Sequence, residues 1–106
     1  MSTINFSYNW NNKLDCSSFT TIRLRNENKY RVGLEYKAWL KQESKGNVKC
    51  LDIRHFWLAD LNEFVARLDT GYSVEECRQI ILRMYPAVDF SKKQLSLILL
   101  HKIKKQ

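Results

Sequence analysis

The stretch from Leu95 to Ile103 is apolar on both of its alternating faces, and this pattern constrains the fold more than any other part of the chain. Such a composition is typical of a strand inside a sheet, where both faces are covered. We therefore expect a central strand with the interior of a curled sheet or barrel on one side and helices on the other. The 106 residues fit one domain, 1–106.

Four earlier segments alternate between apolar and polar residues, as half-buried strands do. They are 4–10, 19–25, 34–40 and the segment that starts at Val48. The polar residues 11–13 predict a turn after the first strand. Glu43–Gly46 predicts a turn between the last two, which would then pair antiparallel as a hairpin. The apolar phase changes between Cys50 and Leu51, which indicates a β-bulge.

Two helices are expected before the last strand. The first would end at Gly71, which suits a left-handed C-terminal cap. The second would begin with Ser73 and Glu76 as a capping box and stop at Pro86. Their expected core faces are Leu61, Phe64, Val65 and Leu68 in the first helix, and Val74, Cys77, Ile80, Ile81 and Met84 in the second. This pattern predicts an α+β domain, most economically a small β-barrel with two helices packed against it.

The formal net charge of +7 is the strongest compositional indication of a partner. Cationic proteins attract polyanions, so the charge favours RNA or a nucleotide as the ligand, while solubility is the alternative explanation. The basic run 101–105 would add field strength without specificity.

The three cysteines, Cys16, Cys50 and Cys77, are widely spaced and odd in number. We expect reduced thiols, with Cys50 and Cys77 on apolar faces, and neither a disulfide framework nor a metal site. No apolar run is long enough to cross a bilayer, and no export signal is present at the N-terminus. These features predict a cytoplasmic protein without a membrane partner, a metal or a cofactor.

The strand around Thr20–Arg25 has two faces with different chemistry. Thr20, Ile22 and Leu24 would face a core, whereas Thr21, Arg23 and Arg25 would share the opposite face. A hydroxyl and two guanidinium groups in a row suit the binding of an anion, because arginine holds phosphate with two parallel hydrogen bonds. A solvated face, with Arg23 paired to an acid such as Asp69 or Glu35, is the alternative.

Lys29, Tyr30 and Arg31 place two cations around an aromatic ring, a combination suited to stacking a base while neutralising phosphate. The alternative is that Tyr30 packs beneath the turn before Gly33.

The order of three features resembles the ASCH family, whose domains are relatives of the PUA domain. The features are a polar loop leading into a Thr-x-Arg strand, an aromatic-basic-x-Gly turn before the next strand, and a second helix ending in Tyr85-Pro86 before a last apolar strand. The resemblance covers roughly residues 16–103. It implies a small PUA-like β-barrel with helices beside it, a cleft between them, and a role in binding RNA or nucleotides.

The strand motif of this family reads G-x-K-x-x-E/T-x-R. This chain has at those positions Cys16, Ser18, Thr21 and Arg23, so that the threonine and the arginine match. One branch of the family hydrolyses acetylated cytidine with the motif's Lys and Thr and a Glu from the helical region. The resemblance implies Asp69 near the position of that Glu. Because Ser18 cannot supply an amine, we expect binding and not catalysis.

The resulting hypothesis is a small ASCH-like domain that binds RNA, a nucleotide or a nucleoside in a cleft beside the Thr21–Arg25 strand, with Arg23 as anion clamp. One alternative is an amidohydrolase that acts on N-acylated pyrimidine nucleosides with Ser18, Thr21 and Asp69. The other is a protein-interaction or inhibitor module whose basic face docks on an acidic protein.

Overall fold

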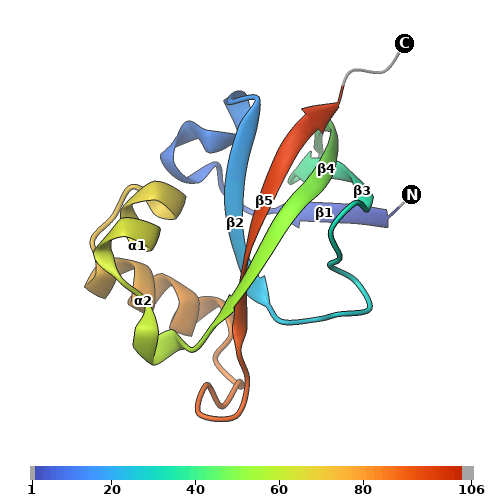
Figure 1. Cartoon of the computed structure of the whole chain (residues 1–106). Helices are drawn as coiled ribbons and strands as arrows, with labels where there is room; N and C mark the ends of the chain where they lie inside the picture. The colour runs from blue at the N-terminus through green and yellow to red at the C-terminus, as the bar shows by residue number, and fades with distance from the viewer. Residues whose placement is uncertain (1, 104–106) are drawn as a thin grey trace.

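A computed structural model describes residues 2–103 and has an α+β architecture, as the sequence predicts (Figure 1). Lys104 and Lys105 of the terminal basic run lie outside the described residues. The elements are β1 (Ser2–Phe6), the 3-10 segment η1 (Trp10–Asp15), β2 (Ser18–Leu24), β3 (Glu35–Leu40), β4 (Glu43–Phe56), the 3-10 turn η2 (Leu58–Asp60), α1 (Glu63–Thr70), α2 (Val74–Met84) and β5 (Leu95–Ile103).

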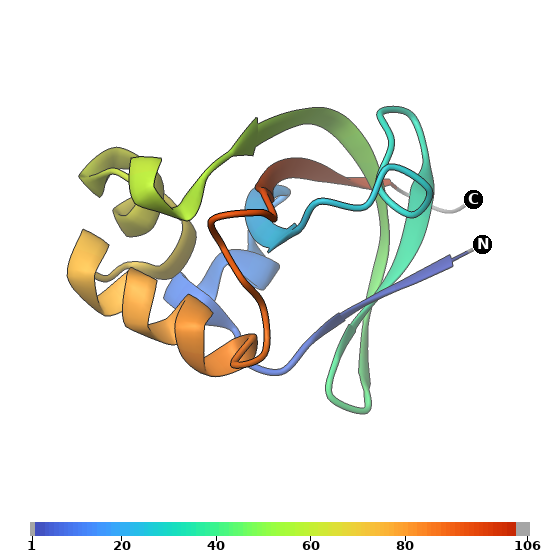
Figure 2. The ribbon, with the colours of Figure 1, turned by 90° about the horizontal axis from the view of Figure 1, so that it is seen from below.

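The five strands form one curled sheet in the order β1-β3-β4-β5-β2. β1 pairs parallel with β3, and the other neighbours pair antiparallel. Figure 2 shows the long strand β4 arching over the sheet, with both helices on the side away from the β3–β4 hairpin. Since β1 and β2 are the two edges and do not pair with each other, the sheet is a half-barrel with an open seam between them.

β5 lies between β4 and β2, and the prediction of a central covered strand is confirmed. Its residues enter two separate cores. Ile98 and Leu100 belong to the core inside the half-barrel, which also holds Phe6, Leu14 and Tyr36. Leu95 belongs to the core beneath the helices, which is completed by Ile22, Leu58, Leu61, Ala66, Cys77 and Ile81.

The hairpin of β3 and β4 and the bulge after Cys50 are confirmed, but the position of the turn is wrong. The chain turns at Lys41 and Gln42, and Glu43 already pairs with Leu40. Gly46, with φ +89°, lies within β4 opposite the irregular pairing that follows Lys37. Gly46 therefore supplies the positive φ that a β-bulge needs, and it is not part of the turn.

The first strand is shorter than its alternation predicts. β1 ends at Phe6, which pairs with Leu40, the last residue of β3, and whose carbonyl oxygen accepts a hydrogen bond from the Lys41 backbone N–H at 2.9 Å. Beyond that point β3 has turned away and offers no partner. Tyr8 and Trp10 therefore leave the sheet and enter the loop and η1.

The second helix is as predicted, with Ser73 and Glu76 forming the capping box and the helix ending before Pro86. In α1 the predicted left-handed cap at Gly71 is confirmed, with φ +80°. The predicted core face is confirmed for Leu61, just before the helix, and for Val65, but it is wrong for Phe64 and Leu68. Phe64 and Leu68 are 75% and 57% exposed. Met84 of the second predicted face is also exposed.

The buried face of α1 consists of Ala66, Asp69 and Thr70. The buried face is thus rotated from the predicted one. The carboxylate of Asp69 can lie on this face because it has a buried cationic partner. Within residues 2–103 no helix is both long and apolar enough to cross a membrane.

Candidate ligand-binding site

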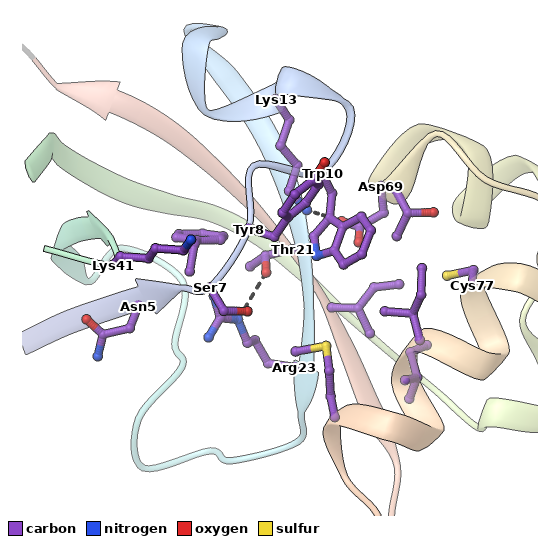
Figure 3. Close-up of a pocket in the computed structure, with 16 residues that line it drawn as sticks. Asn5, Ser7, Tyr8, Trp10, Lys13, Thr21, Arg23, Lys41, Asp69 and Cys77 are labelled. Atoms are coloured by element: carbon purple, nitrogen blue, oxygen red, sulfur yellow. Dashed lines mark hydrogen bonds and ion pairs between the residues drawn. The ribbon is translucent and has the colours of Figure 1, made fainter. Parts of the chain in front are cut away.

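A cavity of about 360 Å³ lies at the open seam of the half-barrel (Figure 3). One wall comes from the end of β1 and the following loop, and the facing wall from β2. The base is formed by α1, α2 and η1. The polar and aromatic residues that line it are Asn5, Ser7, Tyr8, Trp10, Lys13, Thr21, Arg23, Lys41, Asp69 and Thr70, and the apolar lining includes Phe6, Ile80, Ile81 and Met84. The cavity exists because the two edge strands leave a gap that side chains only partly fill.

The most deeply placed charges in the cavity are Lys13 and Asp69. Lys13 Nζ donates to Asp69 Oδ1 at 2.9 Å, and the two side chains are 7% and 6% exposed. Thr20 Oγ1 donates to the same carboxylate oxygen at 2.9 Å. Burial lowers the pKa of Lys13, and the attraction of Asp69 offsets part of that change. The pair therefore provides an amine and a carboxylate, held in contact, in a largely dry setting.

The η1 segment forms a kinked loop that brings Lys13 inward. Asn11 and Asn12 adopt left-handed backbone conformations, with φ of 59° and 52°, which asparagine tolerates better than other side chains. Asn9 Oδ1 accepts from the Leu14 backbone N–H at 2.9 Å and closes the loop. Consecutive asparagines before a lysine were the sequence signal for this bend, although residues 11–13 were predicted only as a polar turn.

The loop also contacts the end of α1. Asn11 Nδ2 donates to the carbonyl oxygen of Leu68 at 3.4 Å. A Cβ atom on Gly71 would lie 3.2 Å from Asn11 Oδ1, so glycine is needed there both for its positive φ and for space. The loop that carries Lys13 is thus packed against the helix that carries Asp69.

Thr21 and Arg23 lie together on the β2 wall of the cavity, as the alternation of the strand predicts. Arg23 Nε donates to Thr21 Oγ1 at 3.0 Å, and the guanidinium carbon lies 4.6 Å from the centre of the Phe6 ring. The ion pairs within residues 2–103 do not include Arg23, so the alternative of a pairing with Asp69 or Glu35 is not observed. The arginine bridges the seam through a ring contact and keeps its charge available.

Arg25 directly follows β2, which ends at Leu24, and lies outside the cavity. It forms an ion pair with Glu27, and its Nη1 donates to Gln94 Oε1 at 2.5 Å. Ser18 also lies outside, where its Oγ is 2.6 Å from His101 Nδ1 on the exposed side of the sheet. The predicted enzymatic set of Ser18, Thr21 and Asp69 is therefore not gathered in one place.

The Lys29–Arg31 segment is also separate from the cavity. Tyr30 is 9% exposed and packs near Tyr36, with 6.2 Å between the ring centres, while Lys29 Nζ lies 5.4 Å from the Tyr30 ring centre. The alternative prediction for Tyr30, packing beneath the turn, describes its position. A base cannot stack on a ring that is already covered.

Sequence reasoning missed four cavity residues, namely Tyr8, Trp10, Lys13 and Lys41. The Tyr8 and Trp10 rings are 4.5 Å apart between centres, and Trp10 contacts Tyr72 edge-on at 5.9 Å. Their signal was two large aromatic residues within a run of Ser and Asn, where a core strand would be unusual. Figure 3 shows both rings above Thr21 at the mouth of the cavity.

The lining has three cationic side chains, Lys13, Arg23 and Lys41, and one carboxylate, Asp69, a formal excess of two positive charges. Burial raises the pKa of the Cys77 thiol in the same lining, which keeps it protonated at neutral pH and makes it a poor nucleophile. The site can accordingly attract an anion, stack a flat ring and present an amine and a carboxylate to a bound molecule.

Within the described residues no group of three or more His, Cys, Asp and Glu side chains is arranged to hold a metal ion. Comparisons with protein-family models, with curated proteins and with solved structures found no match to this chain.

Proposed function

We propose that the chain is a nucleotide-binding domain of the ASCH type, with a PUA-like half-barrel, whose ligand enters the cavity at the seam beside β2. The observation that carries the proposal is the combination in one cavity of an aromatic mouth and an excess of cationic side chains. A volume of about 360 Å³ lies in the range of pockets for small molecules, roughly 300 to 1,000 Å³. It suits one nucleoside and not a duplex.

Each part of the cavity has a role in this proposal. The base lies against Trp10, because stacking on an aromatic ring works for every base. The Arg23 guanidinium holds the phosphate, and the Thr21 hydroxyl orients that guanidinium through the 3.0 Å hydrogen bond. Support for the ASCH assignment comes from the motif residues, since Thr21, Arg23 and Asp69 all line the same cavity.

The test is the binding of the four ribonucleosides and their 5′-monophosphates, measured by isothermal titration calorimetry. We expect at least one monophosphate to bind, and Arg23→Ala to weaken it by about tenfold or more, as loss of a charge-assisted hydrogen bond does. Arg25→Ala is the matched control, since that arginine directly follows the same strand and lies outside the cavity. Equal losses in both variants, or no binding by the parent, would overturn the proposal.

A second function is favoured by one specific contact, the buried pair of Lys13 and Asp69. Ser18 cannot supply the amine that an ASCH-type amidohydrolase uses, but Lys13 enters the same cavity from an earlier position in the chain. In this proposal water adds to the acyl carbon of an N-acylated pyrimidine nucleoside while Asp69 accepts its proton. The C–N bond breaks, Lys13 donates a proton to the leaving nitrogen, and a carboxylic acid and the free amine result.

Hydrolysis of N4-acetylcytidine, followed by chromatography of the released cytidine and acetate, tests this second function. We expect activity that is lost in Lys13→Arg and Asp69→Asn and retained in Ser18→Ala, because Ser18 lies outside the cavity. An inactive parent at stoichiometric protein would rule out the hydrolase while leaving the binding function intact.

A further inference from the structure

The cavity continues into a second hollow next to the β3–β4 hairpin. The second hollow has a volume of about 640 Å³ and is more open. Ser7, Tyr8 and Lys41 line both spaces. The far side of the second hollow is formed by Leu40, Gln42 and Glu43. Two adjoining spaces with a shared border indicate a ligand longer than one nucleoside.

The border has an aromatic face that is open to solvent. Tyr8 is 55% exposed, although its ring rests against Trp10. A large exposed aromatic ring held by a second ring is preorganised, because the contact restricts its rotation before a ligand arrives. The row of Tyr8, Trp10 and Tyr72 rings therefore presents a stacking face at the point where the two spaces meet.

The border also has a cation in an unusual backbone conformation. Lys41 occupies the left-handed region with φ +54°, in a hairpin position where glycine or asparagine is the common choice. Its backbone N–H is fixed to the carbonyl oxygen of Phe6 at 2.9 Å. None of the ion pairs within residues 2–103 involves its ammonium group. Backbone strain of this kind gathers at binding sites, and here it holds a cation between the two spaces.

We propose that the ligand is a single strand of at least two nucleotides. One base enters the cavity against Trp10, the linking phosphodiester lies at Lys41, and the neighbouring base stacks on Tyr8 in the second hollow. This inference rests on the proposed binding function and adds the substrate class: a nucleotide within or at the end of a single strand, and not a free nucleoside.

The second hollow contains one acid, Glu43, whose Oε1 lies 3.3 Å from Lys45 Nζ. Glu43 and Gln42 line this hollow and not the cavity, and both are exposed. Changes of charge at these two residues therefore act on the second nucleotide alone and are tolerated by the fold. Substitutions at Gln42 and Glu43 therefore distinguish binding in the second hollow from binding in the cavity.

The experiment compares nucleosides, their 5′-monophosphates, and ribo- and deoxyribodinucleotides in calorimetric titrations with the parent. We expect the best dinucleotide to bind about tenfold or more tighter than its better nucleoside component, since one further stacked base contributes roughly 5- to 150-fold. In Tyr8→Ala this ratio should fall toward one, and in Tyr8→Phe it should remain. Gln42→Glu should reduce the ratio and Glu43→Gln should increase it, with nucleoside affinity unchanged in both.

Two failures are distinguishable. The two-nucleotide ligand is wrong if nucleosides or monophosphates bind but dinucleotides bind no tighter. It is also wrong if the ratio of dinucleotide to nucleoside affinity is the same in the parent and in the Tyr8 and Gln42 variants. In both cases the proposal of a cavity for one nucleotide is unaffected. If none of these ligands binds a folded parent, the proposed function fails as well. If the ratio of dinucleotide to nucleoside affinity is equal for ribo- and deoxyribodinucleotides, the inference holds and the 2′-hydroxyl is not recognised.

Discussion

At the scale of single residues, the ion pair of Lys13 and Asp69 places two charges where burial makes them costly. Two charges almost removed from water are expensive unless each has its partner. The Thr20 hydroxyl supplies a further hydrogen bond to Asp69. Both side chains also line the cavity, so the same pair is available to a bound molecule.

We predict that Lys13→Met destabilises the protein by about 3–5 kcal/mol, because it leaves the Asp69 carboxylate buried without its cation. The double variant Lys13→Met with Asp69→Leu should recover most of that loss, since neither charge is then buried. Urea unfolding followed by circular dichroism measures the free energy of unfolding of the single and the double variant. A single variant within about 1 kcal/mol of the parent would mean that the pair is open to water, because exposed pairs contribute no more than this.

The lowered pKa of Lys13 has a consequence for stability at alkaline pH. In the unfolded chain Lys13 keeps its proton until its ordinary pKa of 10.5, whereas the folded protein releases it at a lower pH. Between these two pKa values the unfolded state binds more protons, so the free energy of unfolding rises with pH.

We therefore predict that the parent gains stability relative to the Lys13→Met, Asp69→Leu double variant as the pH rises toward the ordinary lysine pKa of 10.5. Burial also raises the pKa of Tyr85, which acts in the opposite direction, but neither Lys13 nor Asp69 contributes to that shift, so it cancels in the difference. The raised pKa of Cys77 does depend on both residues, so Cys77 is replaced by serine in both proteins. Urea unfolding at a series of pH values gives the difference in free energy of unfolding between the parent and the double variant. A value that does not change with pH would show that Lys13 titrates normally.

At the scale of secondary-structure elements, residues whose environment is set by nearby sequence were predictable. The capping box of Ser73 and Glu76, the cap at Gly71 and the covered strand Leu95–Ile103 depend on local pattern and occur as expected. Thr21 and Arg23 share a wall because alternation along a strand needs no tertiary information.

What escaped prediction depends on contacts between distant segments. Lys13 was placed in a surface turn because its partner Asp69 is 56 residues away in the chain. The same pair lies on the buried face of α1, and Phe64 and Leu68 point outward although their spacing is that of a core stripe. Hydrophobic periodicity assumes that the buried face is apolar, and a buried ion pair violates that assumption.

The contact between the η1 loop and the end of α1 gives a prediction at this scale. Gly71 and Gly33 both have positive φ, but a Cβ on Gly71 would meet Asn11, whereas one on Gly33 has nothing within 4 Å. Gly33→Ala should cost about 1–2 kcal/mol for the left-handed backbone alone. Gly71→Ala should cost more and should also weaken nucleotide binding, because Asn11 must shift in the loop that carries Lys13.

Thermal melting and calorimetric titration of the two alanine variants check this prediction. Because the backbone cost is shared, the difference between the variants reports the Asn11 contact. If both variants lose the same stability and both bind nucleotide as the parent does, the loop and the helix are not coupled.

At the scale of the whole molecule, the net charge of +7 and the excess of two positive charges in the cavity have different effects. The cavity can neutralise only the one or two phosphates of a bound nucleotide or dinucleotide. In the proposed function, the cations outside the cavity attract the part of a strand that extends beyond it. Salt dependence separates these contributions, since log affinity falls by about 0.7 per log unit of salt for each phosphate neutralised on a single strand.

We predict that nucleoside binding hardly responds to salt, that a dinucleotide with one phosphodiester shows a slope near 0.7, and that longer single strands show steeper slopes until the cationic surface is covered. Fluorescence anisotropy with end-labelled oligonucleotides of increasing length gives the slopes. Lys41→Gln should lower the dinucleotide slope, because that lysine borders both hollows, whereas Lys92→Gln, an exposed lysine outside both, should not. Equal slopes at every length would mean that affinity arises inside the cavity alone and that the surface charge does not bind the strand.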